Sequence, residues 1–146
     1  SFELLMRKAL GLYKPSFHLH YYKLSEEKPL VEKGLYAFAQ VKLSVAKKIE
    51  IAAGEGNGPV HALDRALRAA LKPFYPVVEN ITLVDYKVRV LDGHDATASH
   101  VRVLIESSDG KSNWSTVGVS SDVVEASWIA LVDSFEYKLL KDKTGE

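Results

Sequence analysis

The sequence predicts an α+β fold made of two βββα repeats with mainly antiparallel sheets, preceded by a short linker helix. Strand-like runs occur in two groups of three, and one amphipathic helical pattern follows each group. Two such units can bury their apolar sheet faces and helix stripes against one another. A shift of 64 residues also superimposes parts of the two groups, pairing Gly54 with Gly118, Gly58 with Asp122, Val60 with Val124, Ala62 with Ala126, Ala66 with Ala130, and Leu67 with Leu131.

Six strand-like runs supply the predicted sheets. They are rich in apolar or alternating residues and are bounded by turn-forming segments such as SSDGKSN. They cover residues 17–24, 34–47, 48–54, 80–92, 96–107 and 113–120. Run 34–47 alternates with a period of two, which predicts a sheet with one buried face. Its apolar set is Leu35, Ala37, Ala39, Val41, Leu43 and Val45, and the opposite set is Tyr36, Phe38, Gln40, Lys42 and Ser44.

A helix is predicted after each group of strands. The first begins near Gly58, has Pro59 in its favoured first-turn position, and ends before Pro73 and Pro76. The second covers about 122–141 and begins with a capping-box pattern at its first residue, Asp122. Both carry an apolar stripe at helical spacing. The stripes are Val60, Leu63, Leu67, Ala70 and Leu71 in the first, and Val124, Trp128, Leu131, Phe135 and Leu139 in the second.

The chain is predicted to contain a leader and one domain. Residues 1–14 are expected to form a linker helix, which Gly11 ends, because apolar residues recur there at helical spacing. Residues 15–146 form the domain, with repeat one at about 16–73 and repeat two at about 79–141. The chain opens on Ser1 without an initiator methionine, which suggests a fragment of a longer protein.

Composition narrows the classes of function. The 146 residues, 47% of them hydrophobic, can form one domain with a sizeable core. Nineteen basic and nineteen acidic residues balance, which argues against a nucleic-acid partner. The absence of cysteine excludes disulfides and thiolate metal sites and fits a reducing cytoplasm. No apolar run approaches the ~20 residues that span a bilayer, and the amphipathic N-terminus does not resemble a signal peptide.

The segment AAGEGNGPVHALDRAL places three glycines directly before a predicted helix. A phosphate-binding Walker loop would need Lys followed by Ser or Thr after its last glycine, whereas Pro59 and Val60 follow here. A dinucleotide site would need an acidic residue about 20 positions on, and Asp85 lies farther away. The favoured interpretation is therefore a tight strand-to-helix turn, in which glycine tolerates positive φ or lets a backbone or ligand come close.

Other candidate chemical groups do not form a catalytic pattern. His18 and His20 alternate on a strand, yet no third metal ligand lies nearby, so we expect an exposed edge strand. The sequence has no cysteine and no G-x-S-x-G elbow. Asp85, Asp92 and Asp95 lie at predicted strand ends, where solvation or turn capping is the usual role. Four aromatic residues are either core or sheet-face residues or anchors at a dimer interface, and their spacing does not decide between these roles. They are Tyr36, Tyr86, Trp114 and Trp128.

Three segments together resemble the C-terminal regulatory domain of the 2-isopropylmalate synthase and citramalate synthase family. They are GEGNGPVHALDRAL, LVDYKVRVLDGHDATASHVRVLIES and WSTVGVSSDVVEASWIALVDSFEYKLL. The details DYKVRVLD and NWSTVGVS look closer to the citramalate synthase branch. The leader SFELLMRKALG resembles the segment that joins the catalytic part to this domain, so the likeness covers nearly the whole chain.

The resemblance implies two βββα units related by a pseudo-twofold, in a cytoplasmic homodimer that holds a branched-chain amino acid as feedback effector. Leucine inhibits the isopropylmalate branch and isoleucine usually the citramalate branch. The parent enzyme would condense acetyl-CoA with pyruvate or 2-oxoisovalerate in a metal-dependent N-terminal barrel. A barrel needs about 250 residues, so this chain cannot contain one. The domain itself is expected to be non-catalytic and without a cofactor.

The resemblance also implies positions for the effector. The bare turn and helix start would bind its carboxylate, Asp85 its ammonium, and an apolar slot its side chain. His61 departs from the small or acidic residue common in the family, which leaves the preferred effector open. A ligand-free structural dimerisation module is the alternative, and a small stand-alone enzyme is disfavoured. The full predicted set is Gly56, Gly58, Val60, His61, Leu83, Asp85, Tyr86, Val90, Thr97 and Ser99.

Overall fold

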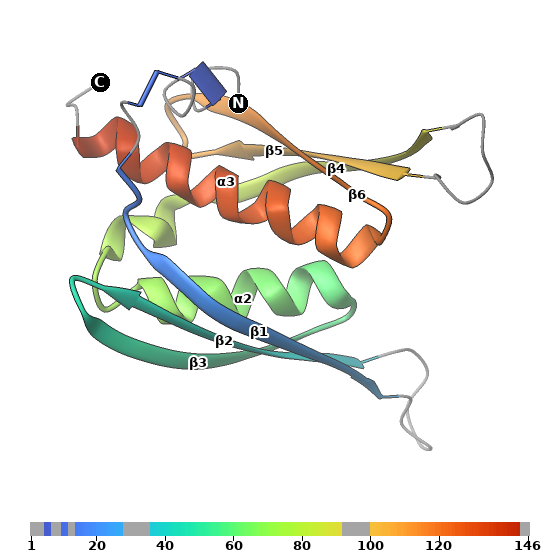
Figure 1. The fold of residues 1–146 in the computed structure, drawn as a ribbon, viewed down its shortest axis with the longest axis horizontal. Coiled ribbons are helices and arrows are strands. Elements are labelled where there is room, and N and C mark those ends of the chain that lie inside the picture. The colour runs from blue at the N-terminus through green and yellow to red at the C-terminus, as the bar shows by residue number, and fades with distance from the viewer. Residues whose placement is uncertain (1–4, 7–9, 12–13, 28–35, 92–99, 144–146) are drawn as a thin grey trace. The chain divides into compact units, whose positions relative to one another are not determined.

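The computed structural model describes residues 5–6, 10–11, 14–27, 36–91 and 100–143 (Figure 1). The chain divides into two compact units. One unit comprises Ser16–Glu79, and the other comprises Ser1–Pro15 with Asn80–Glu146.

The unit Ser16–Glu79 is one βββα repeat. Its strands form an antiparallel sheet in the order β1-β2-β3, and α2 packs on β3 and β2, with little contact to the edge strand β1 (Figure 1). A short 3-10 helix, η1, follows α2. The elements are β1 (His18–Glu27), β2 (Tyr36–Val45), β3 (Lys48–Gly56), α2 (Pro59–Leu71) and η1 (Pro76–Asn80).

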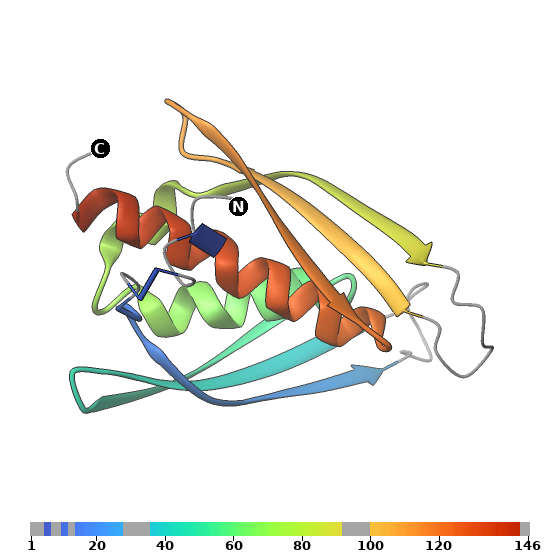
Figure 2. The ribbon, with the colours of Figure 1, turned by 45° about the horizontal axis from the view of Figure 1, so that its top comes forward.

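The second unit repeats this arrangement. Its antiparallel sheet has the order β4-β5-β6, and α3 packs on β6 and β5 (Figure 2). The elements are β4 (Thr82–Leu91), β5 (His100–Ser108), β6 (Asn113–Ser120) and α3 (Val123–Lys143). The predicted α+β fold of two βββα repeats is therefore confirmed. None of the helices in the described ranges is long and apolar enough to cross a bilayer.

The 64-residue shift holds through all six strands. Leu19 pairs with Leu43 in the first sheet, and the residues 64 positions later, Leu83 and Ser107, pair in the second. Each sheet has one register irregularity, directly after Leu19 or Leu83, at the same place in its repeat. Sheet register is therefore the same in both units, bulge included, although the sequence aligned only part of the repeat.

The first unit has an apolar core, as the alternation in β2 predicts. Ala37, Ala39, Val41 and Leu43 are buried on one face of β2, whereas Tyr36 and Phe38 on the opposite face are 41% and 45% exposed. The buried face meets the stripe of α2, whose Ala62, Leu63, Ala66, Leu67, Ala70 and Leu71 are fully buried. Helix α2 ends at Leu71, directly before Lys72 and Pro73, as predicted.

The second unit has polar groups inside its core. Ser107 Oγ and Ser134 Oγ lie 2.6 Å apart, and Trp114 Nε1 donates to the Ser134 carbonyl oxygen at 3.1 Å. Thr116 Oγ1 donates to the Ala130 carbonyl oxygen at 2.6 Å. These bonds tie β5 and β6 to α3 and satisfy groups that would be costly to bury alone.

Helix α3 runs to Lys143, past the predicted end at Lys141. Its last turns are held by Lys138, whose Nζ donates to Asp109 Oδ2 at 2.7 Å and lies 3.0 Å from Asp142 Oδ1. Asp109 lies in the turn between β5 and β6, and Lys141 Nζ reaches Ser112 in the same turn at 3.2 Å. The ion pairs explain the extra length, because they anchor a segment that has no counterpart in α2.

Only part of the predicted linker helix falls in the described ranges. Leu5 and Met6 are helical, and the Leu10 amide donates to the Met6 carbonyl oxygen at 3.0 Å, the spacing of an α-helical bond. Gly11 has φ +69°, the left-handed conformation typical of a glycine that ends a helix. The start of the predicted run 96–107 lies outside the described residues, and β5 begins at His100.

Candidate functional site

Helix α2 begins without a side-chain cap. Gly58 is its N-cap, in an extended conformation, and the Ala62 amide donates to the Gly58 carbonyl oxygen at 3.1 Å. Pro59 has no amide hydrogen, so the free first-turn amides are those of Val60 and His61. In the second repeat Asp122 is the residue equivalent to Gly58, and its Oδ1 accepts from the Val124 amide at 2.7 Å. Helix α3 therefore has a hydrogen-bond acceptor for its first-turn amides in its own Asp122 side chain. Helix α2 has no such acceptor, so its first-turn amides are open to a ligand.

The glycines before α2 allow close packing of strand on helix. None of Gly54, Gly56 and Gly58 has positive φ. A Cβ on Gly54 would lie 2.6 Å from the Ala66 amide nitrogen, and one on Gly56 would lie 2.7 Å from the Ala62 nitrogen. Of the two roles that sequence analysis gave to glycine here, close approach is confirmed and positive φ is wrong. The approaching backbone is α2 itself, and Gly56 is buried beneath it.

Strand β4 carries four of the predicted effector residues, on two different faces. Tyr86 pairs with the buried Ile105 and reaches α3, so Tyr86 and Val90 lie on the helix side of the sheet. The bulge after Leu83 places Leu83 opposite the buried Ser107, on the same side. Asp85 pairs with Glu106 on the outer side. The structure therefore brings together Leu83, Tyr86 and Val90 but not Asp85.

The helix side of β4 lies beyond the edge of α3 and is exposed. We call the residues Leu83, Tyr86, Val88 and Val90 the β4 strip. Tyr86, Val88 and Val90 are 40%, 46% and 65% exposed. Helix α3 packs on β5 and β6, which leaves this apolar row uncovered within its own unit. Such a row fits the apolar part of a ligand or the surface of another subunit.

A hydrogen-bond relay fixes the tyrosine of the strip. Ser127 Oγ donates to the Val123 carbonyl oxygen at 2.6 Å, so its single hydrogen is used there. Tyr86 Oη lies 2.8 Å from Ser127 Oγ and must be the donor, which leaves its own lone pairs free to accept. Sequence reasoning missed Ser127 and Val88. The signal for Ser127 was its position in the repeat, because the equivalent residue of α2 is Leu63.

Asp85 serves its own strand. Its Oδ1 accepts from the Tyr86 amide at 2.8 Å, and its Oδ2 lies 3.5 Å from Lys87 Nζ. Thr97 and Ser99, the last two predicted effector residues, lie outside the described residues, as do Asp92 and Asp95.

Charged groups on α2 tie the helix to η1. Burial raises the pKa of the Asp64 carboxyl, and the adjacent Arg68 opposes this shift. Arg68 Nη2 lies 3.1 Å from Asp64 Oδ1, while its Nη1 donates to the Val78 carbonyl oxygen at 2.6 Å. Lys72 and Glu79 form a further ion pair at 3.0 Å. These contacts join residues of α2 to one another and to η1, which gives the cluster a structural role.

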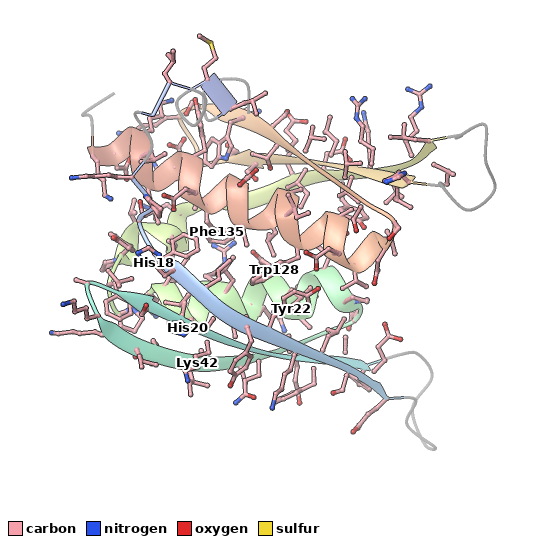
Figure 3. The ribbon with its side chains drawn as sticks, viewed as in Figure 1. His18, His20, Tyr22, Lys42, Trp128 and Phe135 are labelled. Atoms are coloured by element: carbon pink, nitrogen blue, oxygen red, sulfur yellow. The ribbon has the colours of Figure 1, made fainter. Side chains whose placement is uncertain are left out.

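The remaining candidates take the simpler of their predicted roles. His18 and His20 are exposed on the edge strand β1, and His20 Nε2 lies 3.1 Å from Ser44 Oγ (Figure 3). In the described ranges, no cluster of three His, Asp or Glu residues could hold a metal ion. Trp114 and Trp128 are core residues, each 6% exposed. Trp128 extends from the same side of α3 as the buried Phe135 (Figure 3).

Comparison with known proteins assigns the family. The family model described as "LeuA allosteric (dimerisation) domain" matches residues 1–139. The chain belongs to this family. It is 50% identical over 146 residues, 100% of the chain and 28% of the relative, to "(R)-citramalate synthase" of Geobacter sulfurreducens. It is also 50% identical over 143 residues, 98% of the chain and 27% of the relative, to the Aquifex aeolicus protein of the same name.

A "2-isopropylmalate synthase" of Oceanobacillus iheyensis is more distant. It is 38% identical over 95 residues, which cover 62% of this LeuA-type chain and 16% of the relative.

The chain spans about a quarter of the length of the citramalate synthases that it matches. These comparisons confirm the family predicted from the segments that contain GNGPV, DYKV and WSTVGVS. They also confirm the predicted similarity to the citramalate synthase branch.

Proposed function

We propose that this LeuA-type domain binds isoleucine or leucine and gives feedback inhibition of a cytoplasmic citramalate or 2-isopropylmalate synthase. The family description names the domain as allosteric and dimerising, and the relatives with high identity are named as citramalate synthases. In this proposal the domain is a non-catalytic homodimer. The acyltransferase reaction, from acetyl-CoA and pyruvate or 2-oxoisovalerate, belongs to an N-terminal barrel with its divalent metal.

The open start of α2 is the observation that carries the proposal. The amides of Val60 and His61 lack the side-chain cap that Asp122 gives to α3. Amide donors and the positive end of the helix dipole bind an anionic group well. An amino-acid carboxylate is the anion that a regulator of amino-acid synthesis would place there.

The β4 strip, described within its own unit, is a second candidate surface for the effector. Leu83, Val88 and Val90 offer aliphatic surface for a branched side chain. The acceptor for the effector ammonium is proposed to be Tyr86 Oη, because its own hydrogen goes to Ser127. This assignment replaces Asp85, which lies on the other face of β4.

Calorimetric titration of the 146-residue chain with isoleucine and leucine tests the proposal. Saturable heat is expected with at least one of them, and no heat or thermal shift with any branched-chain amino acid would refute it. The Gly58→Asp variant is the sharp probe, since the second repeat already has Asp at this position. It supplies a cap and a negative charge where the ligand carboxylate is expected, so binding should be lost while thermal stability is kept or raised.

Gly58→Asn is the matched control, because it supplies a similar cap without the charge. It should weaken binding less than Gly58→Asp does. Equal binding by wild type and Gly58→Asp would remove the helix start from the effector site.

A ligand-free dimerisation module is the second candidate, favoured by the exposed apolar residues of the β4 strip. The Tyr86→Ala variant separates the two functions when dimer mass and feedback inhibition are measured in the full-length enzyme. Loss of inhibition with an intact dimer supports an effector site. Loss of the dimer with no amino-acid binding by the wild type supports the structural module.

A further inference from the structure

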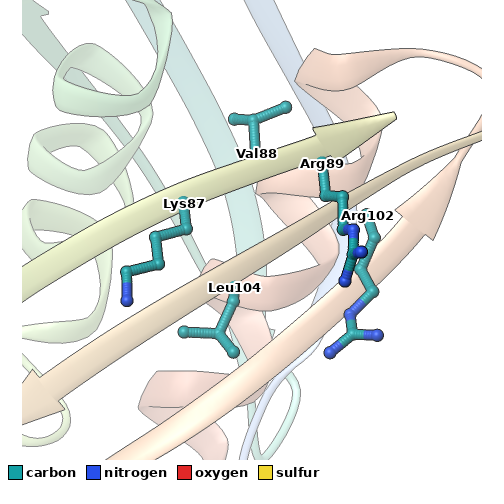
Figure 4. Close-up of a pocket in the computed structure, with 5 residues that line it drawn as sticks. All are labelled: Lys87, Val88, Arg89, Arg102 and Leu104. Atoms are coloured by element: carbon teal, nitrogen blue, oxygen red, sulfur yellow. The ribbon is translucent and has the colours of Figure 1, made fainter. Parts of the chain in front are cut away.

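The two sheets have equivalent hollows on the faces opposite their helices. One is lined by Lys23, Leu24, Ser25, Phe38 and Gln40 and has a volume of about 460 Å³. The other is lined by Lys87, Val88, Arg89, Arg102 and Leu104 and has a volume of about 450 Å³ (Figure 4). Every lining residue of the second lies 64 positions after a lining residue of the first. The hollow is therefore a property of the fold, and each repeat fills its lining with different chemistry.

The second hollow is basic. Arg89 and Arg102 are direct partners across β4 and β5, and in the first repeat Ser25 and Phe38 occupy these positions. Figure 4 shows both guanidinium groups extending to one side of the strands together with Lys87 and Leu104, while Val88 points to the other side. The two guanidinium groups and the Lys87 ammonium on one surface suit a carboxylate or phosphate group, which arginine binds with paired hydrogen bonds.

The register makes the arginine pair costly without a ligand. The same face carries two acidic residues, Asp85 and Glu106, which are also direct partners. Like charges directly opposite one another destabilise a sheet, whereas pairing each acid with an arginine would have stabilised it. In the described part of the chain, neither Arg89 nor Arg102 forms an ion pair, whereas Asp85 Oδ2 lies 3.5 Å from Lys87 Nζ. The acidic pair confines an anion to the Arg89–Arg102 end.

We propose that the Arg89–Arg102 hollow on the outer face of the second sheet is a binding site for a small anion bearing phosphate or carboxylate groups. Apart from Val88, whose side chain points to the other face, the lining of this site lies on the face of β4 opposite the β4 strip. It does not depend on the effector proposal.

Titration of the full 146-residue chain with inorganic phosphate, pyrophosphate and succinate, followed by calorimetry and by amide chemical shifts, tests the site. Saturable binding is expected, with shift changes centred on Arg89, Arg102 and Leu104. Arg89→Gln and Arg102→Gln should each weaken it about ten-fold or more, since each removes one charged fork. Preference for pyrophosphate over succinate assigns a phosphate ligand, and the reverse assigns a carboxylate.

Variants in the first hollow serve as controls. Lys23→Gln changes the equivalent lysine of the first hollow and should leave anion binding unchanged. Ser25→Arg with Phe38→Arg recreates the arginine pair in the first sheet and should add a second site. Without anion, Arg102→Gln should melt at or above the wild-type temperature, because it relieves like-charge repulsion.

Three results would overturn the proposal. The first is binding that does not saturate, which indicates an adventitious ion only. The second is equal weakening by Lys23→Gln and Arg102→Gln, which indicates general charge screening. The third is a lower melting temperature for Arg102→Gln without anion, which indicates that the arginine pair has a structural role.

Discussion

Alanine at the close-packed glycines should destabilise the domain, most of all at Gly118. A Cβ there would collide with the Ala126 carbonyl oxygen and would lie 2.9 Å from both the Ala126 carbonyl carbon and the Ala130 nitrogen. At Gly54 the nearest atom is the Ala66 nitrogen, at 2.6 Å, and at Gly56 it is the Ala62 nitrogen, at 2.7 Å. All of these are backbone atoms of a helix, so relief requires the whole helix to move from its sheet.

Overpacking of this kind costs about 1–3 kcal/mol and occasionally more. We expect Gly54→Ala and Gly56→Ala to fall in this range and Gly118→Ala at or above its upper end. For a domain of this size, 1 kcal/mol lowers the melting temperature by roughly 2–4 °C. Gly118→Ala should therefore melt roughly 6–12 °C below the wild type, in calorimetric or circular-dichroism melts.

Gly58→Ala is the matched control, because nothing lies within 4 Å of its added Cβ and its φ is −160°. Its melting temperature should stay close to that of the wild type. A Gly118→Ala protein that melts within about 1 °C of the wild type would refute the packing argument. The same reasoning makes Gly56→Ala a poor probe of effector binding, since any loss of inhibition would follow from a displaced α2.

Two more predictions concern the second unit. Tyr86→Phe removes the hydroxyl that donates to Ser127 and should lower the free energy of unfolding by about 0.5–1.5 kcal/mol, measured by urea titration, while Lys87→Gln on the other face of β4 should have little effect. The hydrogen bond from Lys138, with those from the Ser112 and Lys111 amides, lowers the pKa of the Asp109 carboxyl in the folded protein. The ionised Asp109 therefore stabilises the fold above its unfolded-state pKa of about 3.9, and this stabilisation is lost as the pH falls toward the folded-state pKa. Urea titrations at stepwise lower pH should show a smaller acid loss for Asp109→Asn than for the wild type, and equal pH dependence would contradict the assignment.

The repeat architecture could be predicted because local patterns agree with the fold. Alternation in β2 marked its buried face, while Pro59 after Gly58 and the capping residue Asp122 marked the two helix starts. Internal duplication supplied an independent check, since each repeat predicts the other. The sequence also identified the family through segments that span both repeats.

The face of each residue on β4 could not be predicted. Simple alternation would place Leu83 with Asp85 and against Tyr86. The bulge after Leu83 inserts one residue, so that Leu83 shares a face with Tyr86 while Asp85 lies opposite. A bulge leaves no clear composition signal here, because Val84 is an ordinary strand residue. Of the four predicted effector residues on β4, Asp85 therefore lies on the face opposite the other three.

The two repeats have the same arrangement of strands and helix, but they hold the helix in place with different side chains. In the second repeat, Asp122 caps the helix, a serine network joins it to the sheet, and Lys138 secures its end. The first repeat has Gly58, Leu43 and Phe74 at the positions of Asp122, Ser107 and Lys138. Its helix is held by apolar packing and keeps free amides at its start. Because the second repeat shows that this fold accepts an aspartate cap, the bare Gly58 is not imposed by the fold, and a ligand carboxylate is the partner that we propose for it.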